Sequence, residues 1–153
     1  MFATGRCSCG LVHYEMQREP MIVHCCHCRQ CQRETGASFA LNAMVELDSL
    51  HVSGPVRAQD RPTGSGKGVR AMGCERCGAT LWVVYATTGA AFAWVRVGTL
   101  DAPDLCPPSV HVFTASKQPW VALEDGAPVF EGFYPPGSVW TAEARARRQA
   151  ASN

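Results

Sequence analysis

The sequence predicts a mainly β fold with one short helix at the C-terminus, and composition and turn residues are the reasons. Gly 14 and Pro 10 are frequent together for 153 residues, and the apolar runs are short. No long helical period appears before the C-terminal tail. A chain of this length usually forms one domain around one sizeable core, so we expect a single domain over residues 1–153.

The first half of the chain supplies candidate strands and a turn-rich segment. Residues 10–16 alternate, with Val12, Tyr14 and Met16 on one face, which is typical of a half-buried strand. The other expected segments are strands at residues 39–47 and 50–52 and a polar loop or edge hairpin at residues 54–68.

The second half supplies a hairpin, a loop and the helix. Residues 81–85 and 91–97 are apolar on both faces and flank Thr88-Gly89, which predicts a hairpin in the core. Residues 101–108 are expected to form a loop. Residues 140–151 are rich in Ala, Arg and Glu and form the one helix that the sequence predicts.

Charge and cysteine usage limit the classes of function. The formal net charge is only +1, so a general electrostatic grip on nucleic acid is not expected. The longest uncharged run, residues 77–95, contains turn residues and suits a buried hairpin better than a membrane span. Residues 1–10 have no apolar signal-peptide core, and an odd count of nine cysteines argues against a disulfide framework. We therefore expect a cytoplasmic protein whose reduced thiols bind metal.

Two of the cysteine motifs have the form of metal-binding knuckles. They are Cys7-Ser8-Cys9-Gly10 and Cys74-Glu75-Arg76-Cys77-Gly78. Glycine permits the positive φ of a tight turn whose backbone N–H groups point at the sulfurs. Two such pairs can supply four thiolates to a tetrahedral zinc ion, and we prefer this structural site to the alternative that the cysteines are small buried hydrophobic residues.

A third motif places Cys26, Cys28 and Cys31 within six residues. Three local thiols can bind one zinc ion and leave its fourth position open, which is typical of a catalytic rather than a structural zinc site. A second structural site remains the alternative. The residues that could close it are His24, Cys25 or His27 nearby and Cys106 or His111 from a distance.

Cys25 is the least suitable of these additional ligands. It is adjacent to Cys26, and neighbouring side chains diverge in extended chain, so both rarely reach one ion. We interpret the isolated residues His13, His51 and His111 as core or surface histidines rather than ligands.

The three motifs, in this order, resemble the glutathione-dependent formaldehyde-activating enzyme family, which also includes centromere protein V. The opening Gly5-x-Cys7-x-Cys9-Gly10 is similar to the start of that family. Cys26-His27-Cys28-x-x-Cys31, followed by Thr35 to Phe39, is similar to its central motif, and Cys74-x-x-Cys77-Gly78 to its second knuckle.

The resemblance implies a zinc-stabilised fold of coiled antiparallel sheets of the β-tent type. It implies one structural zinc on Cys7, Cys9, Cys74 and Cys77 and a second zinc, where chemistry would occur, on Cys26, Cys28 and Cys31. The implied activity is that of S-(hydroxymethyl)glutathione synthase, formally a carbon–sulfur lyase, with glutathione as co-substrate and a small aldehyde as its partner.

Recognition of anionic glutathione would need basic side chains near the second zinc. The candidates are Arg29, Arg33 and Lys117, and the alternative for each is an ordinary solvated surface charge. A noncatalytic zinc module that binds a thiol metabolite or a protein partner is the second hypothesis for function.

Overall fold

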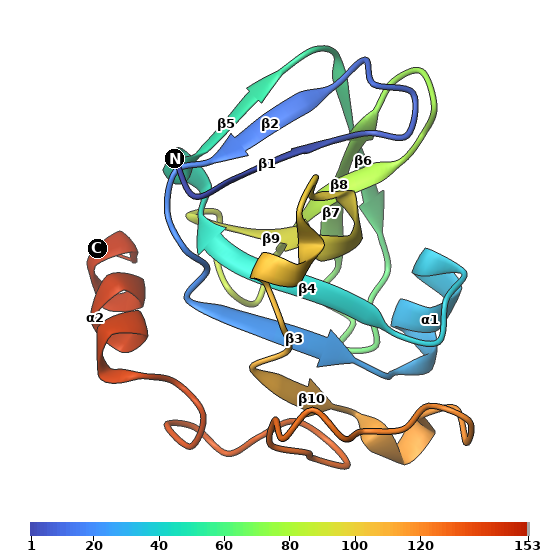
Figure 1. Ribbon diagram of the computed structural model, residues 1–153, viewed down its shortest axis with the longest axis vertical. Coiled ribbons are helices and arrows are strands. Elements are labelled where there is room, and N and C mark those ends of the chain that lie inside the picture. The colour runs from blue at the N-terminus through green and yellow to red at the C-terminus, as the bar shows by residue number, and fades with distance from the viewer. Residues whose placement is uncertain (153) are drawn as a thin grey trace.

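The structure is a computed structural model that describes residues 1–152, and it contains two β-sheets. Figure 1 shows the smaller sheet at the top of the view, beside one end of the larger sheet. The three-stranded sheet has the order β1 (Ala3–Arg6), β2 (His13–Met16) and β5 (Leu50–Ser53). The seven-stranded sheet has the order β10 (Val110–Val112), β3 (Ile22–Cys26), β4 (Ala40–Glu46), β9 (Phe92–Arg96), β8 (Thr80–Tyr85), β7 (Val69–Cys74) and β6 (Val56–Arg61). Short 3-10 turns lie at Leu47–Ser49, Val97–Thr99, Pro103–Leu105 and Thr114–Ser116.

The mainly β prediction is confirmed, and the alternating strand is present in a shorter form. Val12, Tyr14 and Met16 are buried while Leu11 and His13 are exposed, although the strand β2 itself begins only at residue 13. The turn before it belongs to the first cysteine knuckle, which explains the later start.

The predicted core hairpin is also present. Strands β8 and β9 pair antiparallel, with Val83 opposite Trp94, as expected for a hairpin in the core. Residues 54–68, expected as a loop or an edge hairpin, contain only the first strand of such a hairpin: β6 lies at the end of the sheet order and pairs with β7, which begins beyond the segment. The sequence did not indicate β1, β3, β7 or β10.

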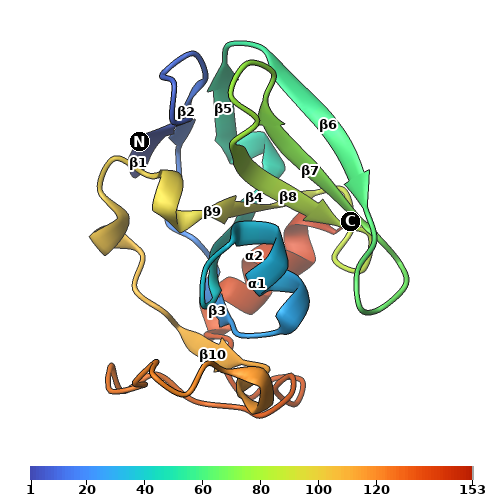
Figure 2. The same ribbon diagram turned by 90° about the vertical axis from the view of Figure 1, so that its right-hand side faces the viewer.

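One strand pair in the larger sheet is parallel. Strand β10 runs parallel to β3, while the other strand pairs in both sheets are antiparallel. Figures 1 and 2 both place β10 and the following chain along the end of the larger sheet, beside β3. This parallel pair determines which residues meet at the cysteine-rich end of β3.

The two faces of the larger sheet pack against different parts of the chain. Val23 and Ala43 belong to a core cluster shared with Tyr14 and the rest of the smaller sheet. Their neighbours Ile22 and Met44 face the opposite side, where the buried residues include Tyr134 and Ala144 from the C-terminal segment. Strand alternation therefore separates the environments of adjacent residues on β3.

The C-terminal helix is confirmed as α2 (Ala142–Ala151), whose first turn is capped by the Thr141 hydroxyl. The expectation of a single helix was wrong, because a helix of seven residues, α1 (Arg29–Thr35), precedes β4. The Cys28 side chain caps its N-terminus, and Gly36 ends it in the left-handed conformation. Its residues carry no apolar period, so propensity and pattern alone did not indicate it.

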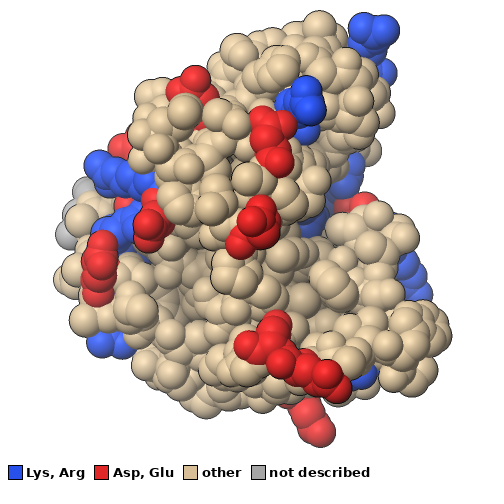
Figure 3. All heavy atoms as spheres, viewed as in Figure 1, with Lys and Arg blue, Asp and Glu red and all other residues tan. Residues whose placement is uncertain are grey.

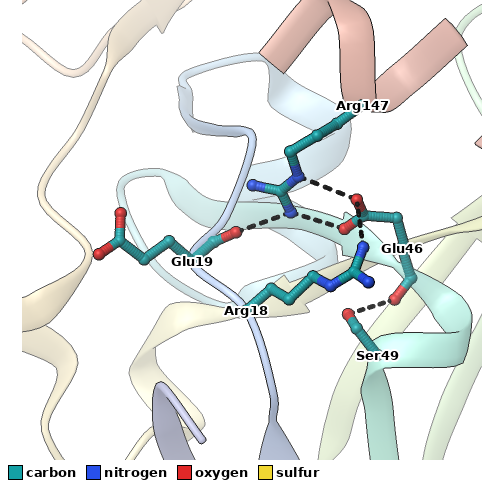
Figure 4. Close-up of polar contacts among 5 residues, drawn as sticks. All are labelled: Arg18, Glu19, Glu46, Ser49 and Arg147. Atoms are coloured by element: carbon teal, nitrogen blue, oxygen red, sulfur yellow. Dashed lines mark hydrogen bonds and ion pairs between the residues drawn. The ribbon is translucent and has the colours of Figure 1, made fainter. Parts of the chain in front are cut away.

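A buried carboxylate connects α2 to the end of β4. Glu46 accepts hydrogen bonds from the Arg147 guanidinium at 2.6 and 2.9 Å, and Arg18 lies 3.4 Å from the same carboxylate (Figure 4). Hydrogen bonding by Arg147 holds the pKa of Glu46 below its ordinary value. Because the Glu46 side chain is only 5% exposed, this ion pair fixes the position of α2.

Charged groups are dispersed on one face of the molecule. On the face shown in Figure 3, acidic and basic side chains lie scattered over a mostly uncharged surface rather than in one basic patch. Within residues 1–152, no helix has both the length and the apolar character needed to cross a membrane.

Candidate metal centres

The first centre consists of the two knuckle motifs, which the fold brings together. The sulfur atoms of Cys7, Cys9, Cys74 and Cys77 all lie within 4.8 Å of one another. Cys7 and Cys9 are 3.5 Å apart, and Cys9 and Cys74 are 3.8 Å apart. Ligand sulfurs about 2.3 Å from a tetrahedral zinc ion are separated by roughly 3.8 Å. These residues therefore fit a zinc ion.

Local turn geometry prepares both halves of this centre. Gly10 and Gly78 have φ of 72° and 74°, and their N–H groups donate to the Cys7 and Cys74 carbonyls at 3.0 Å. The Val12 N–H donates to the Cys7 sulfur at 3.3 Å. Burial acts to raise the pKa of Cys7, but hydrogen bonds from the Val12 N–H and the neighbouring thiols lower that pKa to about 6. The site is thus suited to thiolate ligands.

The first centre joins the two sheets. Cys7 and Cys9 follow β1 of the smaller sheet, while Cys74 ends β7 of the larger sheet. A metal bound here would close a long loop of the chain and hold two separate sheets in contact.

The second centre lies where β3 meets α1. Cys26 ends β3, Cys28 caps α1 and Cys31 lies in its first turn, and their sulfurs lie within 4.8 Å of one another. The Cys31 N–H donates to the Cys28 sulfur at 3.3 Å. The three thiols share protons through hydrogen bonds. Hydrogen bonds from Cys26 and Cys31 lower the pKa of Cys28, whereas hydrogen bonds with Cys28 and Cys31 raise the pKa of Cys26. Three sulfurs this close fit one zinc ion, which would replace the shared protons.

The fourth position of this second centre has no protein ligand among residues 1–152. No further Cys, His, Asp or Glu joins the three sulfurs at ligand distance. His24 instead bonds the Tyr134 hydroxyl at 2.9 Å, and Cys106 is buried in the other core cluster. Cys25 also faces away from Cys26, and lies with His27 and His111 in a separate group.

A cavity adjoins the second centre. Cys26 is one of its lining residues, and its volume is about 170 Å³. A larger cavity of about 600 Å³ lies next to it and reaches Arg145 and Arg148 on α2. Both cavities are lined by His24, Thr87, Thr88, Trp94 and Phe133.

Several residues of this region carried no signal in the sequence. Asn42 lines the smaller cavity, and its side-chain oxygen accepts a hydrogen bond from Arg96. The positive charge of Arg96 also acts on Cys31. Arg148 lies 5.1 Å from the Trp140 ring, with its guanidinium over the ring. These residues come from β4, β9 and α2, so only their tertiary arrangement associates them with the thiols.

The basic residues predicted from the sequence lie elsewhere. Arg29 and Arg33 are exposed on α1, and Arg29 donates to the Gln32 side chain at 3.0 Å. The Lys117 ammonium donates to the carbonyls of Gln118 and Val121 at 3.0 and 2.6 Å. None of the three lines either of the two cavities beside Cys26, and their role in binding glutathione stays a prediction.

Comparison with known proteins identifies the family. The model of the glutathione-dependent formaldehyde-activating enzyme family matches residues 2–116. The chain belongs to this family. The match includes all seven cysteines of the two centres, whereas α2, with Arg145 and Arg148, lies beyond it. Membership of the glutathione-dependent formaldehyde-activating enzyme family indicates a function connected with glutathione or formaldehyde.

Other comparisons are less informative. No curated protein matches the chain. Among solved structures, a crystal structure of a Rhodobacter sphaeroides protein is 21% identical, with a TM-score of 0.49, and the alignment covers 69% of this chain and 96% of that one.

Proposed function

We propose that this protein joins an aldehyde to the thiol of glutathione at the centre formed by Cys26, Cys28 and Cys31. The reaction is that of S-(hydroxymethyl)glutathione synthase, formally a carbon–sulfur lyase. The observation that carries the proposal is a group of three thiols without a fourth protein ligand among residues 1–152, with Cys26 lining a cavity. Membership of the family supports the choice of substrates.

In this proposal both centres hold zinc. The ion at Cys7, Cys9, Cys74 and Cys77 is structural, and the ion at Cys26, Cys28 and Cys31 would supply stabilisation of a substrate thiolate at neutral pH. The bond that forms joins the glutathione sulfur to the carbonyl carbon, and the proton lost by the thiol ends on the former carbonyl oxygen. No oxidant or reductant is needed.

The side chains of the adjoining cavity would orient the reactants. Trp94 and Phe133 supply apolar walls that exclude water from the reacting carbonyl. Asn42 accepts from Arg96 through Oδ1 and donates one Nδ2 hydrogen to the Ala40 carbonyl at 3.4 Å, which leaves its second Nδ2 hydrogen to donate to the aldehyde oxygen.

The larger cavity would accept the rest of glutathione. Its volume of about 600 Å³ lies within the range of small-molecule sites. Arg145 and Arg148 line it and could pair with the carboxylates of the tripeptide. This assignment gives α2 the role that the sequence suggested for Arg29, Arg33 and Lys117.

The C-terminal helix belongs to the same domain as the sheets in this reading of the chain. We infer that residues 1–153 act as one domain of the β-tent type, and the Arg147–Glu46 ion pair, which ties α2 to β4, supports this. All nine cysteines are free, which supports a reducing, cytoplasmic location.

The test is the rate of exchange between free and glutathione-bound formaldehyde, measured by NMR with ¹³C-labelled formaldehyde. The zinc-loaded protein should accelerate exchange, and Cys28→Ser should abolish the acceleration while Cys106→Ala retains it. Equal rates for wild type and Cys28→Ser would overturn the proposal. Binding of glutathione without any acceleration would instead support a noncatalytic zinc module.

A further inference from the structure

A third group of metal-ligating side chains is present on the other side of β3. The Cys25 sulfur lies 3.5 Å from His27 Nε2, and His27 Nε2 lies 3.0 Å from His111 Nδ1. All three ligand atoms are within 4.8 Å of one another. The three residues are 2%, 0% and 4% exposed, so polar atoms of three side chains converge inside the protein.

Strand pairing brings these residues together. Cys25 and Cys26 are adjacent on β3 and face opposite sides, so the second centre takes Cys26 and leaves Cys25. His27 is two residues beyond Cys25, which returns its ring to the same side. His111 lies directly beside Cys25 in the parallel register of β10 and β3.

A carboxylate from outside the group orients one of the rings. The Asp125 carboxylate oxygens lie 2.9 and 3.1 Å from His111 Nε2. An ionised carboxylate only accepts hydrogen bonds, so Nε2 carries the proton and the lone pair of Nδ1 points at Cys25 and His27. A histidine that binds metal through one nitrogen and donates to a carboxylate through the other is the usual arrangement in zinc sites.

The second ring is free to present its lone pair as well. His27 Nδ1 is the buried side-chain nitrogen or oxygen that has no hydrogen-bond partner within residues 1–152. Without metal, the His27 proton lies on Nε2, which donates to the Nδ1 lone pair of His111; because no neighbour engages Nδ1, the proton can move there when zinc binds, and Nε2 then acts as a ligand.

We propose that Cys25, His27 and His111 bind a third zinc ion, with Asp125 as the positioning residue for His111. One thiolate and two imidazoles are ligands that zinc accepts. Tetrahedral zinc separates two ligand nitrogens by roughly 3.3 Å and a sulfur and a nitrogen by roughly 3.6 Å. The observed 3.0 and 3.5 Å are within a few tenths of an ångström of these separations.

The charges near the group can balance a divalent cation. The Cys25 thiolate and the Asp125 carboxylate each carry one negative charge, which together offset the charge of zinc. Asp125 is 39% exposed, so it can be changed without opening the core.

Zinc content per chain tests this proposal without reference to activity. Native mass spectrometry of the zinc-loaded protein should give one zinc fewer for Cys25→Ala than for wild type, whatever the occupancy of the other two centres. In contrast, Cys28→Ser should lose a different zinc, and the double variant should lose both. Equal zinc content in wild type and Cys25→Ala would overturn the third site and leave the proposed function intact.

A second measurement guards against misfolding of the core variant. Asp125→Asn removes only the charge that orients His111 and should weaken zinc binding at this site by about 10- to 100-fold in a chelator competition. The matched control is Asp104→Asn, an exposed aspartate outside the metal-ligating groups, which should leave the affinity unchanged. Equal affinities for the two variants would mean that Asp125, His111, His27 and Cys25 form only a hydrogen-bonded chain, and would overturn the proposal.

Discussion

The two cysteine centres differ in what they connect. The first joins residues from opposite ends of the first half of the chain, since Cys9 and Cys74 are 65 positions apart, and it links two sheets. The second uses three residues of one turn, where β3 passes into α1. We therefore expect a metal at the first centre to stabilise the fold, and a metal at the second centre to keep one coordination position for an external ligand.

This difference in connectivity predicts that the first centre contributes to stability and the second to the proposed reaction. A metal that closes a long loop constrains much of the unfolded chain, whereas one held by adjacent residues constrains little. A site that does not hold the fold together can exchange its ligands without loss of structure. The following variants test the contrast, from the largest expected effect to the smallest.

Loss of a ligand from the first centre should unfold the protein. We expect Cys77→Ser to be insoluble or to lose its cooperative thermal transition, because structural zinc contributes about 10–16 kcal/mol of apparent binding energy in small zinc peptides. Circular dichroism melting and zinc analysis measure this, with Cys106→Ala as the control. A soluble Cys77→Ser protein that melts cooperatively with one zinc fewer would contradict it.

Loss of a ligand from the second centre should leave the fold intact. Cys28→Ser is expected to melt cooperatively, to keep the zinc of the first centre, and to lose the second zinc together with glutathione-dependent activity. A strong chelator should remove this zinc before that of the first centre, because its fourth position is open to an external ligand. Simultaneous release of both zinc ions would make the second centre structural.

Loss of the ion pair that holds α2 should lower the stability of the fold without changing zinc binding at the first centre. Glu46→Gln removes one partner of a largely buried ion pair, and we expect a loss of about 3 kcal/mol in the free energy of unfolding. Because Arg147 lowers the pKa of Glu46, its stabilisation is complete above about pH 5 and is lost as the pH falls through the lowered pKa.

Urea unfolding at several pH values measures this ion pair. The difference between wild type and Glu46→Gln should be largest near neutral pH and should disappear in acid, and zinc content should stay unchanged. A difference that is independent of pH would mean that the Glu46 charge contributes nothing.

The smallest effect is expected from a single arginine of the larger cavity. Arg148→Ala should raise the KM for glutathione by about tenfold, since one charge-assisted hydrogen bond to a carboxylate contributes about 1.5 kcal/mol or more. The value of kcat should change little, because Arg148 lies away from the thiols. The exposed Arg57 on β6 gives the control variant Arg57→Ala. Equal KM values for the two variants would remove α2 from the glutathione site.

Local spacing allowed the cysteine groups to be predicted. The i, i+2 and i+5 positions of Cys26, Cys28 and Cys31 bring three sulfurs together through one turn, and Gly10 and Gly78 permit the knuckles of the first centre. Alternation likewise predicted the buried face of the strand that carries Tyr14. The divergence of Cys25 from Cys26, expected for extended chain, is present on β3.

The sequence by itself thus determined the mainly β class, the core hairpin and the thiol groups, because these depend on residues close together in the chain. Only the tertiary structure decided that β10 lies parallel to β3 and brings His111 to Cys25 and His27. It also decided that α2, fixed by Glu46, carries Arg145 and Arg148 to the larger cavity, which adjoins the smaller cavity lined by Cys26. The physical reason is that contacts between distant residues depend on strand order and on the packing of whole faces, and no local pattern of residues encodes either.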